Sequence, residues 1–205
     1  MSGGSDVSYM VEQFEFSLVF SLPGAEHDHG DLANAVFGAG FENALVGTGN
    51  PKLLVVDLEA SGSDAEMVIL SAARAILPNL PVGTELREFQ PDLVSLADVA
   101  EKLEVSRQTL QQRDMPLPVF CGLYRIDEVA IALDAVGHPV AGKRRPRFQP
   151  ALAKKWFRGG LGARALNAKL TLRLLDPLTL GMSGDSTCMQ VHSELVSLNG
   201  GRSQT

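Results

Sequence analysis

The sequence predicts an α+β protein built from two folded units and a basic C-terminal extension. Three observations support this prediction. Strand and helix patterns alternate over residues 12–90, and a pair of short capped helices follows from residue 96. The sign of the charge also changes beside the second of these helices. The whole chain has 205 residues and a formal net charge of −6.

The first unit has four strand patterns and two helix patterns. An alternating apolar run predicts a strand over 14–20, and Asp31 can cap a helix that ends between Gly38 and Gly40. Strands over 43–48 and 52–58 flank a Gly-Asn-Pro turn. Ser63 or Asp64 can cap a helix over 65–77, which Pro78 stops, and a last strand covers 84–89.

The order of these elements over residues 12–90 is β-α-β-β-α-β. This order matches the ferredoxin-like motif, in which two helices cover one face of an antiparallel sheet. The motif names an architecture and no activity. A scaffold, a dimerisation surface and a small-ligand sensor therefore all remain open for this unit.

Residues 93–137 begin with a helix whose ends and buried face are visible in the sequence. Ser95 can cap it and Asp98 can complete a capping box. The apolar residues recur at helical spacing: Leu96, Val99, Ala100 and Leu103. After a break at Glu104, Ser106 can cap a second helix that packs through Leu110. This spacing predicts a helix-turn-helix.

The second helix carries polar residues on its remaining positions. Arg can bind guanine and Gln can bind adenine through paired hydrogen bonds, so such a helix suits a DNA major groove. We expect the base contacts from Ser106, Arg107, Gln108, Thr109, Gln111 and Gln112, and a phosphate contact from Arg113. The alternative is an ordinary helical hairpin inside a larger core.

A strand-like segment over 119–126 follows, with Gly122 as a turn and Asp127 as the cap of a helix over 128–136. With the helix pair, the segment Gly122–Val129 resembles the winged DNA-binding module of the MerR and excisionase families. The resemblance covers residues 93–136 and implies that Tyr124 or Arg125 contacts the DNA backbone. Two features depart from it: Glu104 stands where the turn often has Gly, and no long coiled coil follows.

The C-terminal extension, residues 143–180, is basic. Up to Glu104 the chain has four basic and 17 acidic residues, and after it 14 and seven. We expect the acidic half to face away from DNA and the segment 143–173 to clamp phosphates, starting with Lys143, Arg144, Arg145 and Arg147. Pro150 opens a helix that Gly159, Gly160 and Gly162 interrupt. The next segment fits a helix through Leu166, Leu170 and Leu174 or a strand over 169–174, and its helix propensity favours the helix. Residues 181–205 are expected to form a disordered tail.

Several classes of protein are excluded by what the sequence lacks. No apolar run is long enough for a membrane span, no secretory signal is seen, and two distant cysteines fit a reducing, cytoplasmic setting. The group His27, Asp28, His29 and Asp31 matches no metal site. No catalytic set stands out, so neither an enzyme nor a cofactor is expected. Cys121, Trp156 and Phe157 are expected to be buried in packing.

The sequence therefore predicts a transcriptional regulator that binds double-stranded DNA, and we expect it to act as a repressor. One module makes few base contacts, so we expect a homodimer on a two-fold site with half-sites about 34 Å apart. The alternative is an antitoxin-like or recombination accessory protein with an architectural or adaptor role. A protein partner of the N-terminal unit would fit either function.

Overall fold

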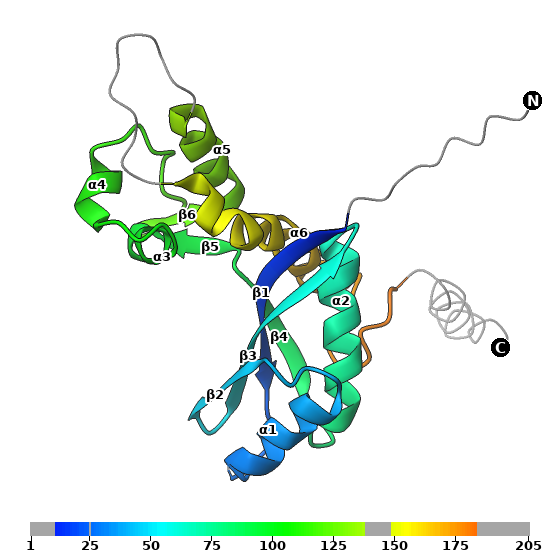
Figure 1. Ribbon diagram of the computed structural model, residues 1–205. Helices are drawn as coiled ribbons and strands as arrows, with labels where there is room; N and C mark the ends of the chain where they lie inside the picture. Colours follow the sequence, from blue (N-terminus) through cyan, green and yellow to red (C-terminus); the bar gives the residue numbers. More distant parts are fainter. Residues whose placement is uncertain (1–10, 25, 138–148, 184–205) are drawn as a thin grey trace, which may run out of the picture.

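The computed structural model describes residues 11–24, 26–137 and 149–183 (Figure 1). It confirms the predicted α+β class. A four-stranded antiparallel sheet has the order β2-β3-β1-β4, and a two-stranded sheet pairs β5 with β6. No helix in these described ranges has the length and apolarity needed to span a membrane.

The elements of the first unit are close to those expected from the sequence. Their bounds are β1 Glu12–Ser21, α1 His29–Gly38, β2 Leu45–Asn50, β3 Leu53–Gly62, α2 Ala65–Ile76, the 3₁₀ helix η1 Leu77–Asn79 and β4 Glu85–Gln90. One predicted cap is wrong. Asp28, not Asp31, caps α1, because its carboxylate accepts the Asp31 backbone N–H at 3.0 Å.

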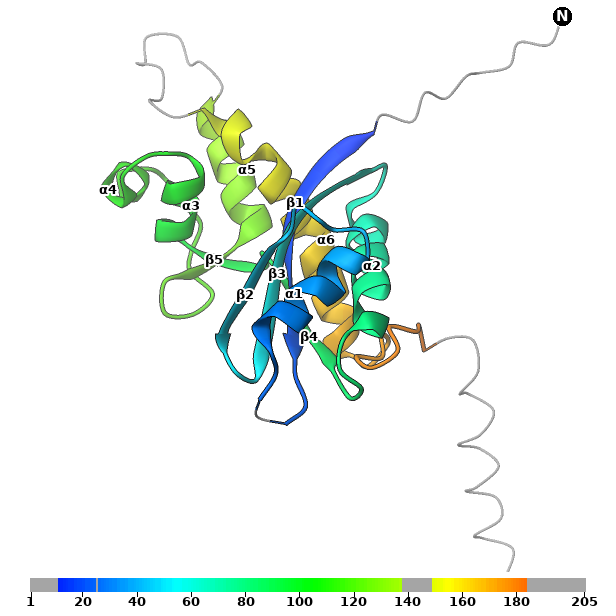
Figure 2. The ribbon, with the colours of Figure 1, turned by 60° about the horizontal axis from the view of Figure 1, so that its bottom comes forward.

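One face of the four-stranded sheet forms the larger core. Along β1 the residues Phe14, Phe16, Leu18 and Phe20 are buried, whereas Glu15 and Ser17 alternate with them on the opposite face. α1, α2 and part of α6 pack on the buried face (Figure 2). Burial of these large side chains is the main stabilising contribution to this unit.

The second unit has a core of its own. Its elements are β5 Leu93–Ser95, α3 Leu96–Lys102, α4 Arg107–Gln111, β6 Leu123–Arg125 and α5 Ile126–Gly137. The strand is shorter than the predicted 119–126, and α5 begins at Ile126, before the expected cap Asp127. Ile126 is fully buried, which ties the start of α5 to the core of α3 and α4.

Helix α6, Lys154–Thr171, follows the 3₁₀ helix η2, Pro150–Ala153, and joins the two cores. Trp156 and Phe157 are buried in the second core, as expected, and Ala163 and Leu166 are buried in the first. Figure 1 shows α6 (yellow) between the large sheet and the group of α3, α4 and α5. The two units therefore share one helix.

The predicted glycine interruption of this helix is wrong, since α6 runs unbroken through all three glycines. Each glycine lets α6 approach another element closely. A Cβ on Gly159 would collide with the carbonyl oxygen of Glu15 in β1. A Cβ on Gly160 would lie 2.5 Å from Ile126 Cδ1, and one on Gly162 would lie 2.8 Å from the carbonyl carbon of Ala65. Tight packing thus offsets the low helix propensity of glycine.

In the described part of the basic extension, ion pairs within the chain leave fewer cations to clamp phosphates than the sequence suggested. Four of the five cations of α6 form ion pairs with acidic residues elsewhere in the chain, at 2.8 Å in the first two pairs: Lys155–Glu59, Arg158–Glu12, Arg164–Asp127 and Lys169–Glu66. The segregation of charge along the sequence therefore serves internal pairing here.

The chain after α6 is ordered at least to Ser183, which corrects the expected start of the disordered tail. Asp176 accepts hydrogen bonds from the backbone N–H groups of Leu178 at 2.9 Å and Thr179 at 2.7 Å. The carbonyl oxygen of Leu180 accepts two hydrogen bonds from the guanidinium of Arg74. The tail beyond Ser183 lies outside the described residues.

Candidate nucleic-acid interface

The α3–α4 turn is built from local hydrogen bonds that the sequence indicated. Ser95 and Asp98 form a reciprocal capping box, and Ser106 caps α4 by accepting the Thr109 N–H at 3.3 Å. Between the helices Glu104 has φ = 54°, in the left-handed region. The strain expected for a non-glycine residue at this position is therefore present and tolerated.

The inner side of the helix pair is sealed by apolar packing. Val99, Leu103 and Leu110 are all at most 1% exposed. Trp156 and Phe157 from α6 complete this core, with ring centroids 5.4 Å apart. Because Leu110 anchors α4 to α3, the rest of α4 is free to point outward.

The outer side of α4 is polar. Ser106, Arg107, Gln108, Gln111 and Gln112 are exposed, and Thr109 and Arg113 are half-buried. The hydroxyl groups of Ser106 and Thr109 lie 2.9 Å apart and hydrogen-bond each other. α4 lies at the end of the molecule that is remote from the large sheet (Figure 1). Its guanidinium, amide and hydroxyl groups can therefore meet an extended partner without obstruction from the first unit.

The hairpin after α4 has an apolar, uncharged tip. Leu117 is 87% exposed and Phe120 is 68% exposed, while Val119 is also at the surface. Cys121, expected to be buried, is instead exposed, because its φ of 44° places it in the tight turn before Gly122. This tip offers apolar surface in the segment where the resemblance implied a wing that contacts the DNA backbone.

Tyr124 and Arg125 lie on β6, between this tip and α5. Tyr124 is half-buried and packs against the second core. The guanidinium Nε of Arg125 lies 3.8 Å from the carboxylate of Glu128. The Arg125 side chain is 42% exposed, so it lies at the surface next to this ion pair.

Charge on the second unit is not strongly positive. Residues 93–137 contain four basic and seven acidic side chains, and Lys102 is paired with Glu15. Additional phosphate-binding charge has to come from outside this range. Lys143, Arg144, Arg145 and Arg147 lie outside the described residues.

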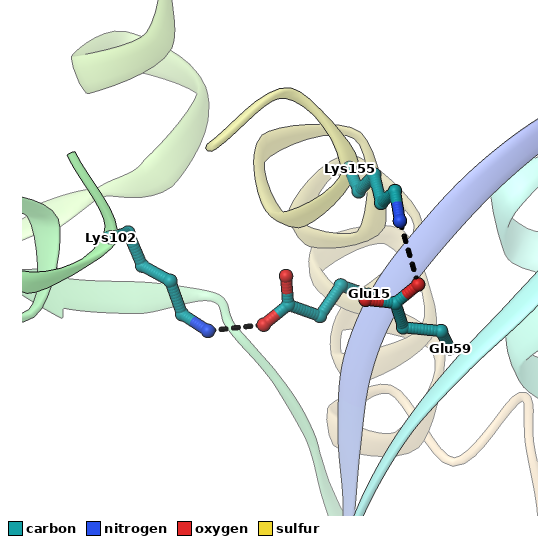
Figure 3. A network of polar contacts seen from close by, with 4 residues as sticks. All are labelled: Glu15, Glu59, Lys102 and Lys155. Carbon is teal, nitrogen blue, oxygen red and sulfur yellow. Dashed lines mark hydrogen bonds and ion pairs between the residues drawn. The ribbon is translucent and has the colours of Figure 1, made fainter. Parts of the chain in front are cut away.

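The sequence did not point to the residues that attach this unit to the sheet. Lys102 on α3 pairs with Glu15 on β1, and Lys155 on α6 pairs with Glu59 on β3 (Figure 3). The ammonium of Lys102 also lies 5.9 Å from the ring centroid of Trp156. The acidic character of the strand positions was the available signal, and it was interpreted only as a half of the chain that faces away from DNA.

The histidine-containing loop has structural contacts of its own. His27 Nε2 hydrogen-bonds the carbonyl oxygen of Pro23, and Asp28 caps α1. Within residues 11–24, 26–137 and 149–183, no group of three or more His, Cys, Asp or Glu side chains is arranged to hold a metal ion.

Comparison with known proteins provides no relative from which a function could be transferred. The chain matches no protein-family model, no curated protein and no solved structure. The geometry of the α3–α4 pair is therefore the feature of this molecule that bears most directly on its function.

Proposed function

We propose that this protein is a sequence-specific DNA-binding regulator, a repressor, that places α4 in the major groove. One observation carries the proposal: Leu110 is fully buried beneath a helix whose other residues are all polar, with Arg107, Gln108 and Gln111 exposed and Thr109 half-buried. A short helix fixed by one apolar anchor and presenting Arg and Gln is what direct reading of base edges requires.

The same proposal interprets the two units as a ferredoxin-like domain and a winged helix-turn-helix. The strand order β2-β3-β1-β4 with helices on one face supports the first assignment. The α3–α4 turn followed by the β5–β6 pairing supports the second. The first domain then serves as a scaffold that orients the second through α6.

Affinity for phosphate is assigned to the segment between α5 and η2. The elements on either side of it, α5 and η2, both contribute to the second core. Four of its residues are cations: Lys143, Arg144, Arg145 and Arg147. Each phosphate contact would release counterions and make binding dependent on salt. Arg113, at the end of α4, is proposed as a further phosphate contact.

An adaptor function is the second candidate. The exposed Leu117 and Phe120 and the acidic balance of residues 93–137 favour it, because an apolar surface without positive charge suits a protein partner. On this function, DNA contact would be architectural or absent.

The deciding experiment measures binding of the full-length protein to double-stranded DNA. A random duplex library is enriched on the protein, and the selected sequence is compared with a scrambled duplex of equal length by fluorescence anisotropy at two salt concentrations. A regulator prefers the selected site by roughly 10³-fold or more. Equal affinity for both duplexes would support the architectural function, and no binding at low salt would refute both DNA functions.

A further inference from the structure

The two edges of the large sheet differ in how their outward-facing backbone groups are hydrogen-bonded. At the β4 edge, the Phe89 N–H donates to Asn167 Oδ1 at 2.9 Å, and Asn167 Nδ2 donates to the Phe89 carbonyl oxygen at 2.8 Å. The Leu86 N–H donates to the carbonyl oxygen of Pro177 at 2.9 Å. α6 and the chain after it therefore satisfy backbone groups of this edge within one molecule.

The β2 edge has no comparable protection in the described chain, where only β3 pairs with β2. Exposed sheet edges are usually guarded by charged residues, by proline or by a covering element. Residues 45–49 have the sequence Leu-Val-Gly-Thr-Gly, with neither charge nor proline, and Leu45 is 71% exposed.

The charge around this strand restricts what can approach it. Between Val11 and Gln90 the chain has twelve acidic and three basic residues. Two copies of this unit would repel each other over most of their surfaces. The uncharged strand β2 is where two copies can meet without placing carboxylates together.

We propose that β2 pairs antiparallel with β2 of a second copy, across a two-fold axis at Val46. The two four-stranded sheets then become one sheet of eight strands, within the usual size range. The regular part of the strand, Leu45–Gly47, precedes the register shift between Gly47 and Asn50. This contact is a self-complementary surface, as a two-fold homodimer requires.

The proposed register brings compatible side chains together. Leu45 of one copy lies opposite Gly47 of the other, so the large exposed side chain covers a position without one. Val46 packs partly against the larger core and would meet its symmetry mate on that same face. The dimer thus buries the exposed Leu45 and extends the core across the axis.

The first test is a charge introduced at Gly47 in the full-length chain. A Cβ at Gly47 would lie 3.6 Å from Val55 Cβ, an ordinary contact, so the monomer accommodates Gly47→Glu. In the dimer the carboxylate would be desolvated against Leu45 of the second copy. We expect the dimer dissociation constant to rise about tenfold or more, with unchanged circular dichroism. Ser61→Glu, which adds the same charge at an exposed position of β3, should leave the constant unchanged.

The second test is oxidative cross-linking in a Cys121→Ser and Cys188→Ser background. Val46→Cys, at the axis, should give a disulfide-linked dimer, whereas Thr48→Cys should not. Molar mass is measured by sedimentation without DNA, so the result is independent of DNA binding. A wild-type chain that stays monomeric at near-millimolar concentration would overturn the proposal. So would a dimer that Gly47→Glu leaves intact, which would assign the contact to another surface.

Discussion

Glu15 and Glu59 lie directly opposite each other on β1 and β3, and their carboxylates are paired with Lys102 on α3 and Lys155 on α6. Two like charges in direct cross-strand register destabilise a sheet. Here Lys102 and Lys155 neutralise them, as Figure 3 shows. The unfavourable pair on the sheet thus becomes a docking point for α3 and α6.

This arrangement predicts a measurable coupling between Glu15 and Lys102. The Lys102 and Glu15 side chains are 38% and 27% exposed, so we expect Lys102→Ala to lower the free energy of unfolding by about 0.5–1 kcal/mol. In a Glu15→Gln background the loss should be smaller, leaving the part due to the contact with Trp156. Urea unfolding of the four proteins at low and high salt measures the coupling. A coupling of zero at low salt would contradict the docking role.

The glycines of α6 predict a destabilisation that depends on backbone contact. Gly159→Ala would place a methyl group against the Glu15 carbonyl oxygen, which no side-chain rotation can relieve. We expect a loss of about 1–3 kcal/mol, as for overpacked cores. Gly38→Ala, at the end of α1 with open space around the new Cβ, is the matched control and should be neutral or slightly stabilising. Thermal unfolding distinguishes the two, and equal effects would refute the close approach.

The positive φ of Glu104 predicts that glycine, usually destabilising within structured segments, stabilises the folded protein at this position. A non-glycine residue in the left-handed region destabilises the folded state by about 1–2 kcal/mol. Glycine removes this strain, but its greater conformational freedom in the unfolded chain offsets part of the gain. Glu104→Gly should therefore raise the free energy of unfolding by about 0.5–1 kcal/mol. Glu101→Gly, on the exposed side of α3, should lower it by about 1 kcal/mol. Two changes of the same sign in urea unfolding would argue against the strained turn.

Asp176 predicts a pH dependence of stability. The backbone N–H of Thr179, above all, lowers the pKa of this carboxyl below its ordinary value. Because the folded pKa is lowered, the stabilisation is fully present at neutral pH and is lost as the pH falls through that folded pKa. We expect Asp176→Asn to cost about 1 kcal/mol at pH 7 and progressively less below about pH 4. A difference that stays constant down to pH 2 would contradict this account.

The features that the sequence predicted well depend on neighbours in the chain. The Ser95–Asp98 capping box, the Ser106 cap and the buried Leu110 all depend on residues within one or two helical turns. Short-range patterns of this kind specify where a helix begins and which side it buries. The α+β class follows from the same local periodicities.

The features that it missed depend on contacts between distant residues. Gly159 seemed to break a helix because its partner, the Glu15 carbonyl oxygen, belongs to the first strand of the chain. Lys155 seemed to be a DNA contact because nothing near it in sequence is acidic, yet Glu59 on β3 lies 2.8 Å away. The composition shows how many charged residues the chain has, whereas the tertiary contacts determine which of them remain available to bind a partner.

The proposed DNA function predicts different effects for a substitution in α4 and for substitutions in the segment between α5 and η2. Arg107→Ala should reduce discrimination between the selected and the scrambled duplex by about 1–3 kcal/mol, because the variant cannot hydrogen-bond a base edge at that position. Arg144→Ala with Arg145→Ala should weaken binding to both duplexes and reduce the salt slope by about 0.9 for each phosphate that is no longer neutralised. Lys52→Ala, an exposed charge in the β2–β3 turn, controls for net charge. Equal and sequence-independent reductions in affinity in the Arg107 variant and the double variant would show that α4 does not read bases, since a helix that only neutralises phosphate cannot tell the duplexes apart.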